Sequence, residues 1–509
     1  MVTRVTAQAA GRKVAKNVQK NVKRAVSGTL GISGERMSKV DTAWLRMDND
    51  ANLMMIVGVW QLAPGVKHAA VCERIENSLL KYDRFKQRVM EDAAGATWVM
   101  DRNFDLANHV VPEKLPKSTN QEQALQDRVA ILATQRLDPK RPLWQIHLIE
   151  DYTGPDGVKG SAMIVRIHHC IADGIALISV TMSLVDGGAP PPERRKKEPA
   201  AGAEDWITDT LLKPFTDITV KALGAVGEGA ARSLGMLGDP KKGMQQGASG
   251  SFDMAKVLFQ LLSDSAALAL MPDDSKTRLK GKPGGAKKVA WCQPIPLDEV
   301  KAVGKALNCS INDVLLSCVA GALGEYLKSF GDDVAGQEIR AMVPVNLRPM
   351  DQAHKLGNRF GLVPLVLPIG VENPIERVYE VRRRMAALKG SYQPLLAFSL
   401  LAVAGLLIKP AQDVMLNLFA KKTTAVMTNV PGPREKLKFC GSTLEQSMFW
   451  VPQSGDVGLG VSILSYGGGV QFGVITDSTL CPEPQRIIDE FVPEFAKLSI
   501  VTLMLPWGE

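Results

Sequence analysis

A proline-rich and charged stretch near the middle of the chain constrains its fold more than any other feature. Residues 186–205 read DGGAPPPERRKKEPAAGAED, with three consecutive prolines, a cluster of charges and no apolar periodicity, which is the composition of a linker. On both sides of this stretch, apolar runs of strand length alternate with segments of helical periodicity. A chain of 509 residues is also too long for one ordinary domain. The sequence therefore predicts an α/β protein with two lobes joined by a long connection.

Shifts in composition divide the chain into four segments. We predict a basic N-terminal arm at 1–36, a first lobe at 37–185, a linker and weakly patterned helical insert at 186–288, and a second lobe at 289–509. The strands expected from apolar runs are 54–62, 144–152 and 161–167 in the first lobe, and 339–347, 361–369, 423–430, 457–466 and 469–477 in the second. The expected helices are 69–82, 121–137, 175–184, 297–307 and 311–330.

The positive charge of the chain is concentrated in the N-terminal arm. Residues 1–40 hold nine Lys or Arg and one acid, Glu35, which leaves equal numbers of basic and acidic residues in the rest of the chain. Residues 12–30 wind into a basic helix with a stripe of valines, a pattern typical of weak binding to an anionic membrane or lipid-inclusion surface. A solvated arm is the alternative. No aromatic residues are interleaved for base stacking, so we expect no nucleic-acid partner.

Cysteine usage and hydropathy predict the compartment. The seven cysteines are scattered, odd in number and without a CxxC pair, which indicates a reducing environment and no metal site. No apolar run reaches the 18 residues of a membrane span, and the N-terminus has no apolar core of a signal peptide. The longest apolar segment, residues 395–408, suits a buried or interfacial helix. We expect a cytoplasmic protein that associates peripherally with membranes or lipid inclusions.

Two adjacent histidines stand where a predicted strand ends, in VRIHHCIADGIAL. Consecutive strand residues point to opposite faces, so His169 shares the apolar face of Met163, Val165 and Ile167, whereas His168 shares the face of Arg166. An imidazole near its ordinary pKa of about 6.5 can take a proton from an alcohol. Asp173 could orient the ring or hold the loop through an arginine, and Gly174 permits a tight turn into the next helix.

The alternative is that both histidines are satisfied core residues. Against this, the other four histidines of the chain are isolated, so this pair with its nearby acid is the constellation that has the parts of an acid/base site. The sequence has no HExxH, GxSxG, GxxxxGK or GxGxxG motif. Cys170 remains a candidate nucleophile, although its position in the strand turns it away from His169.

The segment HHCIADG matches the HHxxxDG motif of CoA-dependent acyltransferases, and the chain resembles the bacterial wax ester synthase/acyl-CoA:diacylglycerol acyltransferase family. RPLWQIHLIE carries that family's PLW element at Pro142, Leu143 and Trp144, and SINDVLLS carries its ND element at Asn312 and Asp313. VPVNLR, GNRFG and TNVPGP resemble its C-terminal half in content and order. The resemblance implies two chloramphenicol-acetyltransferase-like lobes of mixed sheet and helices with an active-site tunnel between them.

The resemblance also implies roles for the motif residues. His169 is the implied general base, His168 a supporting residue, and Asp173 a structural or orienting residue. A thioester attack builds charge on the carbonyl oxygen and needs a donor, for which Asn312 is a candidate and Thr428 or Asn429 weaker ones. Asn312 could instead cap its helix, and NVPGP is an ordinary turn sequence. Pro142, Leu143, Trp144, Asp313 and Gly174 are expected to shape the lobes.

The implied reaction moves a long-chain acyl group from acyl-CoA, a co-substrate, to diacylglycerol or a long-chain alcohol in a ternary complex. We expect no permanently bound cofactor and no metal. Two alternatives remain: an acyltransferase of the same fold that uses a carrier-protein thioester and a sugar or polyketide acceptor, and a non-catalytic coat protein of lipid inclusions.

Overall fold

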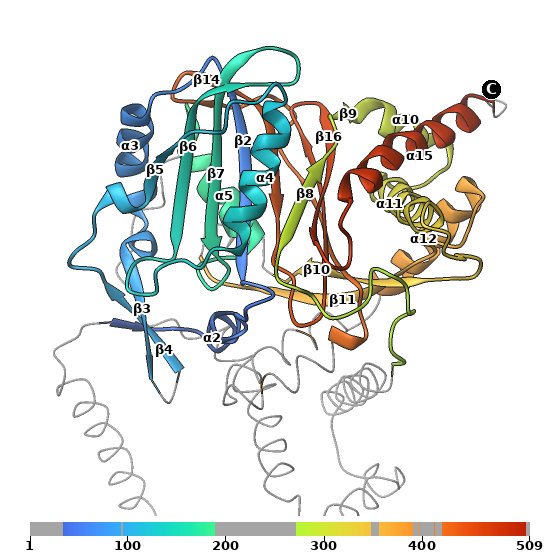
Figure 1. Ribbon diagram of the computed structural model, residues 1–509, viewed down its shortest axis with the longest axis horizontal. Coiled ribbons are helices and arrows are strands. Elements are labelled where there is room, and N and C mark those ends of the chain that lie inside the picture. Colours follow the sequence, from blue (N-terminus) through green and yellow to red (C-terminus); the bar gives the residue numbers. More distant parts are fainter. Residues whose placement is uncertain are drawn as a thin grey trace, which may run out of the picture.

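The computed structural model describes residues 34–92, 95–188, 271–347, 356–389 and 420–504, together with Ala397 and Gln412. Two large sheets stand side by side, each with its own helices, so the mixed α/β fold of two lobes is confirmed (Figure 1). The predictions for most of the N-terminal arm, for most of the insert and for the apolar segment at 395–408 fall outside the described residues.

The first sheet has six strands, in the order β13-β14-β2-β7-β6-β5. Their bounds are β2 (Met55–Ala63), β5 (Val110–Glu113), β6 (Trp144–Thr153), β7 (Lys159–His168), β13 (Lys438–Phe439) and β14 (Ser442–Trp450). The helices of this lobe are α2 (Lys39–Arg46), α3 (His68–Asn77), α4 (Gln121–Thr134) and α5 (Gly174–Leu184), with 3₁₀ turns at Leu79–Lys81, Asp83–Lys86 and Leu106–Asn108. A small sheet of β1 (Gly34–Arg36), β4 (Gly95–Met100) and β3 (Gln87–Asp92) adjoins α2.

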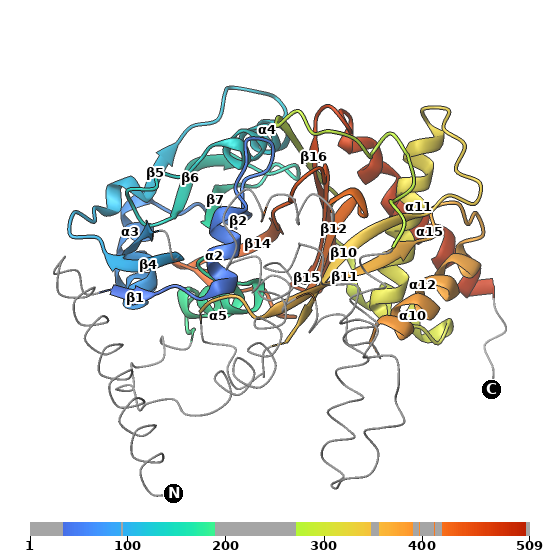
Figure 2. The same cartoon turned by 90° about the horizontal axis from the view of Figure 1, so that it is seen from below.

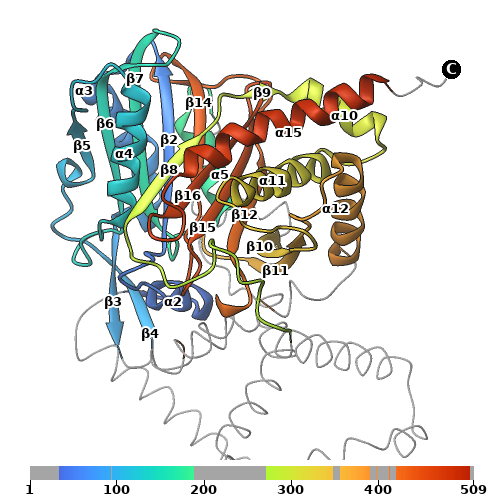
Figure 3. The ribbon, with the colours of Figure 1, turned by 45° about the vertical axis from the view of Figure 1, so that its right-hand side comes forward.

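The second sheet has seven strands, in the order β11-β10-β12-β15-β16-β8, with β9 also paired to β16. Their bounds are β8 (Lys287–Trp291), β9 (Ile295–Pro296), β10 (Ile339–Asn346), β11 (Phe360–Leu367), β12 (Ala425–Pro431), β15 (Leu459–Tyr466) and β16 (Gly469–Asp477). Helices α10 (Leu297–Ala306), α11 (Ile311–Lys328), α12 (Pro374–Lys389) and α15 (Pro484–Met504) lie together on one side of this sheet (Figure 3). The largest core cluster is formed between them and the sheet, and α11 is buried along most of its length.

Two strands from the second half of the chain, β13 and β14, join the sheet of the first lobe. β14 pairs antiparallel with β2, from Thr443 opposite Ala63 to Trp450 opposite Val57, with an irregularity between Leu444 and Gln446. The first sheet is therefore built from two distant parts of the sequence, and the division of the chain in sequence differs from the division of the molecule in space.

The helices within the described ranges differ in length and hydropathy. No single one of them is both long and apolar enough to cross a membrane. α10 and α11 reach the required length and hydropathy together, but they are bent by 99° at the break between them.

Candidate active site

The histidine pair lies in a strand–turn–helix unit at the end of β7. The His168 main-chain N–H donates to the Leu143 carbonyl at 2.9 Å, and the His169 N–H donates to the Met54 carbonyl at 2.7 Å. The ladder between β2 and β7 thus continues for one residue past the strand. Asp173 is the N-cap of α5, where its Oδ1 accepts the Ala176 N–H at 2.9 Å, a stabilising arrangement because it satisfies an otherwise unpaired donor of the first turn.

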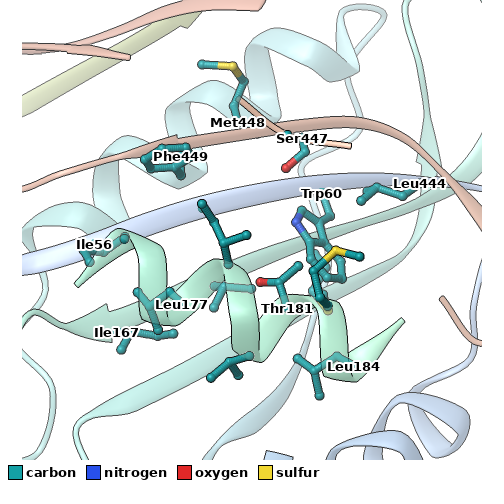
Figure 4. A pocket seen from close by; sticks show the side chains of 18 of the residues that line it. Ile56, Trp60, Ile167, Leu177, Thr181, Leu184, Leu444, Ser447, Met448 and Phe449 are labelled. Atoms are coloured by element: carbon teal, nitrogen blue, oxygen red, sulfur yellow. The ribbon is translucent and has the colours of Figure 1, made fainter. Parts of the chain in front are cut away.

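An apolar cavity of about 180 Å³ lies between α5 and the strands β2, β7 and β14 (Figure 4). Met163, Val165 and Ile167 of β7 line it, so the alternation expected along this strand is present in the structure. Other lining residues include Ile56, Gly58 and Trp60 of β2, Leu177 and Thr181 of α5, and Ser447 and Phe449 of β14. Ile167 and Gly174 bring the cavity wall to both ends of the motif turn, although the His169 ring itself is not part of the lining.

Aromatic rings hold His169 in place. The Trp44 ring stacks on it with centroids 4.4 Å apart and planes 17° apart, and the Phe360 ring lies at 5.5 Å. These rings come from α2 and β11, which meet on the underside of the molecule (Figure 2). His169 is 4% exposed, and its Nδ1 has no hydrogen-bond partner among the described residues.

Burial dominates the titration of His169. Burial lowers the pKa of His169 to about 4, although the main-chain carbonyl of His169 and the Asp173 carboxylate act in the opposite direction. An uncharged imidazole is cheaper to bury than a charged one. The ring is therefore neutral at pH 7, which is the state that a general base requires.

The environment of His168 is the opposite. Its Nε2 lies 3.4 Å from Oδ1 of Asp48, and its Nδ1 accepts the Cys170 N–H at 3.2 Å. Burial alone would lower the pKa of His168, but Cys170 and Asp48 outweigh burial and raise it. Because Nδ1 lies against the Cys170 main-chain N–H and Nε2 lies against the Asp48 carboxylate, both ring nitrogens of His168 face protein groups and not a substrate.

Asp173 links the motif to the second half of the chain. Its Oδ2 accepts the main-chain N–H of Arg359 at 2.9 Å, and its own N–H donates to the Gly357 carbonyl at 3.3 Å. The sequence predicted that Asp173 would orient the ring or hold the loop through an arginine; the hydrogen bond seen here goes to the main chain of an arginine.

The ND element begins α11. Ser310 is the N-cap and forms a capping box with Asp313, so reading Asn312 as the cap is wrong: Asn312 is the second residue of the helix. Its Oδ1 accepts a hydrogen bond from Nδ2 of Asn429 at 2.7 Å. The structure thus joins two of the expected oxyanion donors to each other, but no hydrogen bond connects them to His169 within the described ranges. The third, Thr428, is buried and donates to the Val461 carbonyl at 3.5 Å.

The PLW element supports the motif strand from the neighbouring strand. The carbonyl of Leu143 accepts the His168 N–H, and that of Pro142 accepts the Trp144 N–H at 2.9 Å. The Trp144 ring is buried in the cavity wall, where its Nε1 donates to the Phe85 carbonyl at 2.8 Å.

Sequence reasoning missed three residues that surround the histidines: Trp44, Asp48 and Asn358. Trp44 and Asp48 lie in a stretch before β2 to which no element was assigned. Asn358 lies in GNRFG, a segment noted for its content but not for a role. The signal that could have found it is an asparagine beside a glycine just before an apolar strand, which often indicates a side chain used to fix a turn.

Two family models cover most of the chain. The wax ester synthase/diacylglycerol acyltransferase catalytic domain matches residues 37–315, and the C-terminal domain of the same family matches residues 356–499. The chain belongs to this family. The predicted resemblance is therefore confirmed, and the protein is an acyltransferase.

Curated relatives of the acyltransferase agree with the family assignment. A Mycobacterium tuberculosis protein named probable diacylglycerol O-acyltransferase is 26% identical over 478 residues, covering 92% of this chain and 96% of its own. Wax ester synthase/diacylglycerol acyltransferase 11 of Arabidopsis thaliana is 25% identical, covering 89% and 93%.

Solved structures agree on the fold of the acyltransferase. A wax ester synthase/diacylglycerol acyltransferase from Marinobacter aquaeolei VT8 has a TM-score of 0.62 at 20% identity, covering 92% of this chain and 99% of its own. A trichothecene 15-O-acetyltransferase from Fusarium sporotrichioides has a TM-score of 0.57 at 12% identity, covering 91% and 94%.

No group of three or more His, Cys, Asp or Glu side chains in the described part of the chain could hold a metal ion.

Proposed function

We propose that this acyltransferase moves a long-chain acyl group from acyl-CoA to the hydroxyl of a diacylglycerol or a long-chain alcohol, which gives a triacylglycerol or a wax ester. The observation that carries the proposal is a neutral, buried imidazole, that of His169, at the end of an apolar cavity wall. Apolar pockets with few polar groups are typical of sites for lipophilic ligands. The names of the family and of its relatives support the same two acceptors.

His169 acts in two successive proton transfers. The imidazole takes the hydroxyl proton of the acceptor while the acceptor oxygen bonds to the thioester carbon. The C–S bond then breaks, and the departing CoA thiolate receives the proton from the imidazolium. Because both substrates are bound together, no acyl-enzyme forms, and proximity supplies part of the rate. Asn312 is our candidate for the donor to the oxyanion.

A purified-enzyme assay tests the reaction. Palmitoyl-CoA is offered with dioleoylglycerol, hexadecanol or a sugar, and the same acyl group is offered on a carrier protein. We expect ester from at least one lipid acceptor with the CoA donor, and at least about a hundredfold slower formation of ester by the His169→Gln variant. Ester formed only on the sugar, or only from the carrier protein, would replace this function with the alternative of the same fold.

We also propose that the arm at residues 1–36 places the acyltransferase on anionic membranes or lipid inclusions in the cytoplasm. The support is the sequence, in which basic residues oppose a valine stripe. Sedimentation with phosphatidylglycerol-containing vesicles should capture the full chain at low salt and release it at high salt. A variant without residues 1–33 that sediments equally well would exclude this role.

A further inference from the structure

Residues 357–359, just before β11, run alongside the catalytic motif. Gly357 and Arg359 both bond to the main chain or side chain of Asp173, and Ala172 forms an isolated bridge with Gly357. Gly357 has a φ of 106°, a conformation that favours glycine. This geometry leaves Asn358, between the two fastened residues, directed at His169.

The hydrogen bonds of Asn358 fix the orientation of its amide. Oδ1 of Asp41 accepts both the Asn358 main-chain N–H at 3.1 Å and its Nδ2 at 2.8 Å, and Nδ2 also donates to the His169 carbonyl at 2.7 Å. Both partners of Nδ2 are acceptors, so the amide nitrogen must occupy that side. Asp41, which is buried, lies on α2 one turn before Trp44, the residue that stacks on the imidazole.

Among the described residues, two buried polar atoms at this place have no hydrogen-bond partner. One is Oδ1 of Asn358, an acceptor, and the other is Nδ1 of His169. Buried polar groups are seldom left unpaired. The side chain of Asn358 also raises the pKa of His169, as an acceptor beside the ring should.

We propose that Asp41 and Asn358 are positioning residues that set the tautomer of His169. In the substrate complex, Oδ1 of Asn358 accepts the Nδ1–H of His169, so the lone pair lies on Nε2, where it takes the proton of the acceptor hydroxyl. In the other tautomer a lone pair on Nδ1 would face the carbonyl oxygen of Asn358, which is repulsive. The inference rests on the proposed role of His169 as base and extends it to two residues to which the sequence analysis gave no role.

The test compares Asn358→Leu with Gln471→Leu. Gln471, on β16 in the second sheet, is also a buried amide whose nitrogen donates twice, to the Cys292 carbonyl and to Gln446. Both variants should lose similar stability, measured as the urea midpoint. For Asn358→Leu we expect kcat to fall at least about tenfold while KM for palmitoyl-CoA and for the acceptor changes less than about threefold. For Gln471→Leu we expect kcat to stay within about twofold.

The tautomer of His169 is measured directly by ¹⁵N NMR of protein labelled at histidine. The signals of His169 are assigned as those that disappear in the His169→Gln variant. With CoA bound, the wild type should show the proton on Nδ1, and Asn358→Leu should show a mixture or the Nε2–H form. If Asn358→Leu does not fold, Asp41→Asn is the deciding variant. It keeps the shape of the Asp41 side chain and weakens the hydrogen bonds that this side chain accepts from Asn358. It should change kcat and the tautomer of His169 in the same direction as Asn358→Leu.

The outcomes separate this inference from the proposed function. Full activity or an unchanged tautomer in Asn358→Leu, or in Asp41→Asn if Asn358→Leu does not fold, would overturn the positioning role of Asp41 and Asn358. In that case an inactive His169→Gln would still support His169 as the general base. An active His169→Gln overturns both.

Discussion

The two faces of the first sheet, around β6 and β7, hold histidines of similar burial and different use. On the cavity face, Met163, Val165 and Ile167 lead to His169, just past the end of β7, whose Nδ1 has no hydrogen-bond partner among the described residues. On the face beneath α4, Arg166 donates to Gln145, and His147 of β6 bonds through one ring nitrogen to Glu113 and through the other to Gln145. Burial lowers the pKa of both His147 and His169 to about 4.

The difference shows that a low pKa does not by itself make a base. Both rings are neutral at pH 7, but both nitrogens of His147 lie beside side-chain oxygens of the same face, and the single N–H of the ring donates to one of them. His169 keeps part of its hydrogen-bonding capacity uncommitted because its neighbours are aromatic rings. A functional site is therefore recognised by buried polar atoms without hydrogen-bond partners as much as by shifted pKa values.

Replacing His169 or His147 by glutamine should give the largest difference in kcat between the two faces. His169→Gln should lower kcat by roughly 10²–10⁴, the usual contribution of a general base, with an unchanged urea midpoint. His147→Gln is the matched control on the other face and should keep kcat. Loss of turnover in both variants, measured as ester formed from palmitoyl-CoA, would mean that the faces are not functionally distinct.

Removing the anchor of His168 should cost stability more than catalysis. In Asp48→Ala, the Met54 N–H, now 2.5 Å from Oδ1, and the Nε2–H of His168 lose their acceptor. Leaving a buried donor unpaired costs about 1–3 kcal/mol, which the urea midpoint at pH 7 will measure. A fall in kcat as large as that of His169→Gln would instead make His168 part of the chemistry.

Filling the cavity face should change chain-length preference. A Cβ on Gly58 would meet only ordinary contacts, the nearest being the Met448 carbonyl at 3.5 Å, so Gly58→Val should fold and narrow the cavity. We expect kcat/KM for palmitoyl-CoA to fall about tenfold relative to octanoyl-CoA, near the lower end of the range for a methylene-scale misfit. A change that follows the length of the alcohol acceptor and not of the acyl donor would assign the cavity to the acceptor.

Acidification should weaken the fold through both neutral histidines. Their folded pKa values near 4 lie below the ordinary value of 6.5, so between these limits the unfolded chain binds protons that the folded chain does not. Stability should fall as the pH drops from about 6.5 to about 4, by up to about 1.4 kcal/mol per pH unit for each histidine. Urea titrations at pH 7, 6 and 5 will measure the slope, which His147→Gln should reduce; a slope unaffected by that change would contradict the neutral state of His147.

Local patterns predicted the elements well because neighbours in sequence determine them. The strands β2, β6 and β7 and helix α5 follow alternation and apolar spacing, and the family motifs identified the chemistry. The pairing of β14 with β2, the ring of Trp44 and the contacts of Asn358 were not predictable, since each depends on which distant segments meet. The alternation of side chains along β7 distinguished His169 from His168, but it could not reveal Asp48, which lies against the His168 ring.

The crossing of β14 into the first lobe has a consequence for biogenesis. A ribosome that has released residues 37–185 has produced β2 and its neighbour β7 but not β14, so the other edge of β2 must wait until residue 450 emerges. A chain nicked in the segment between 188 and 271 should accordingly survive as a two-fragment complex, clasped by the β2–β14 ladder. Neither fragment should be soluble when expressed alone, and co-expression should restore both.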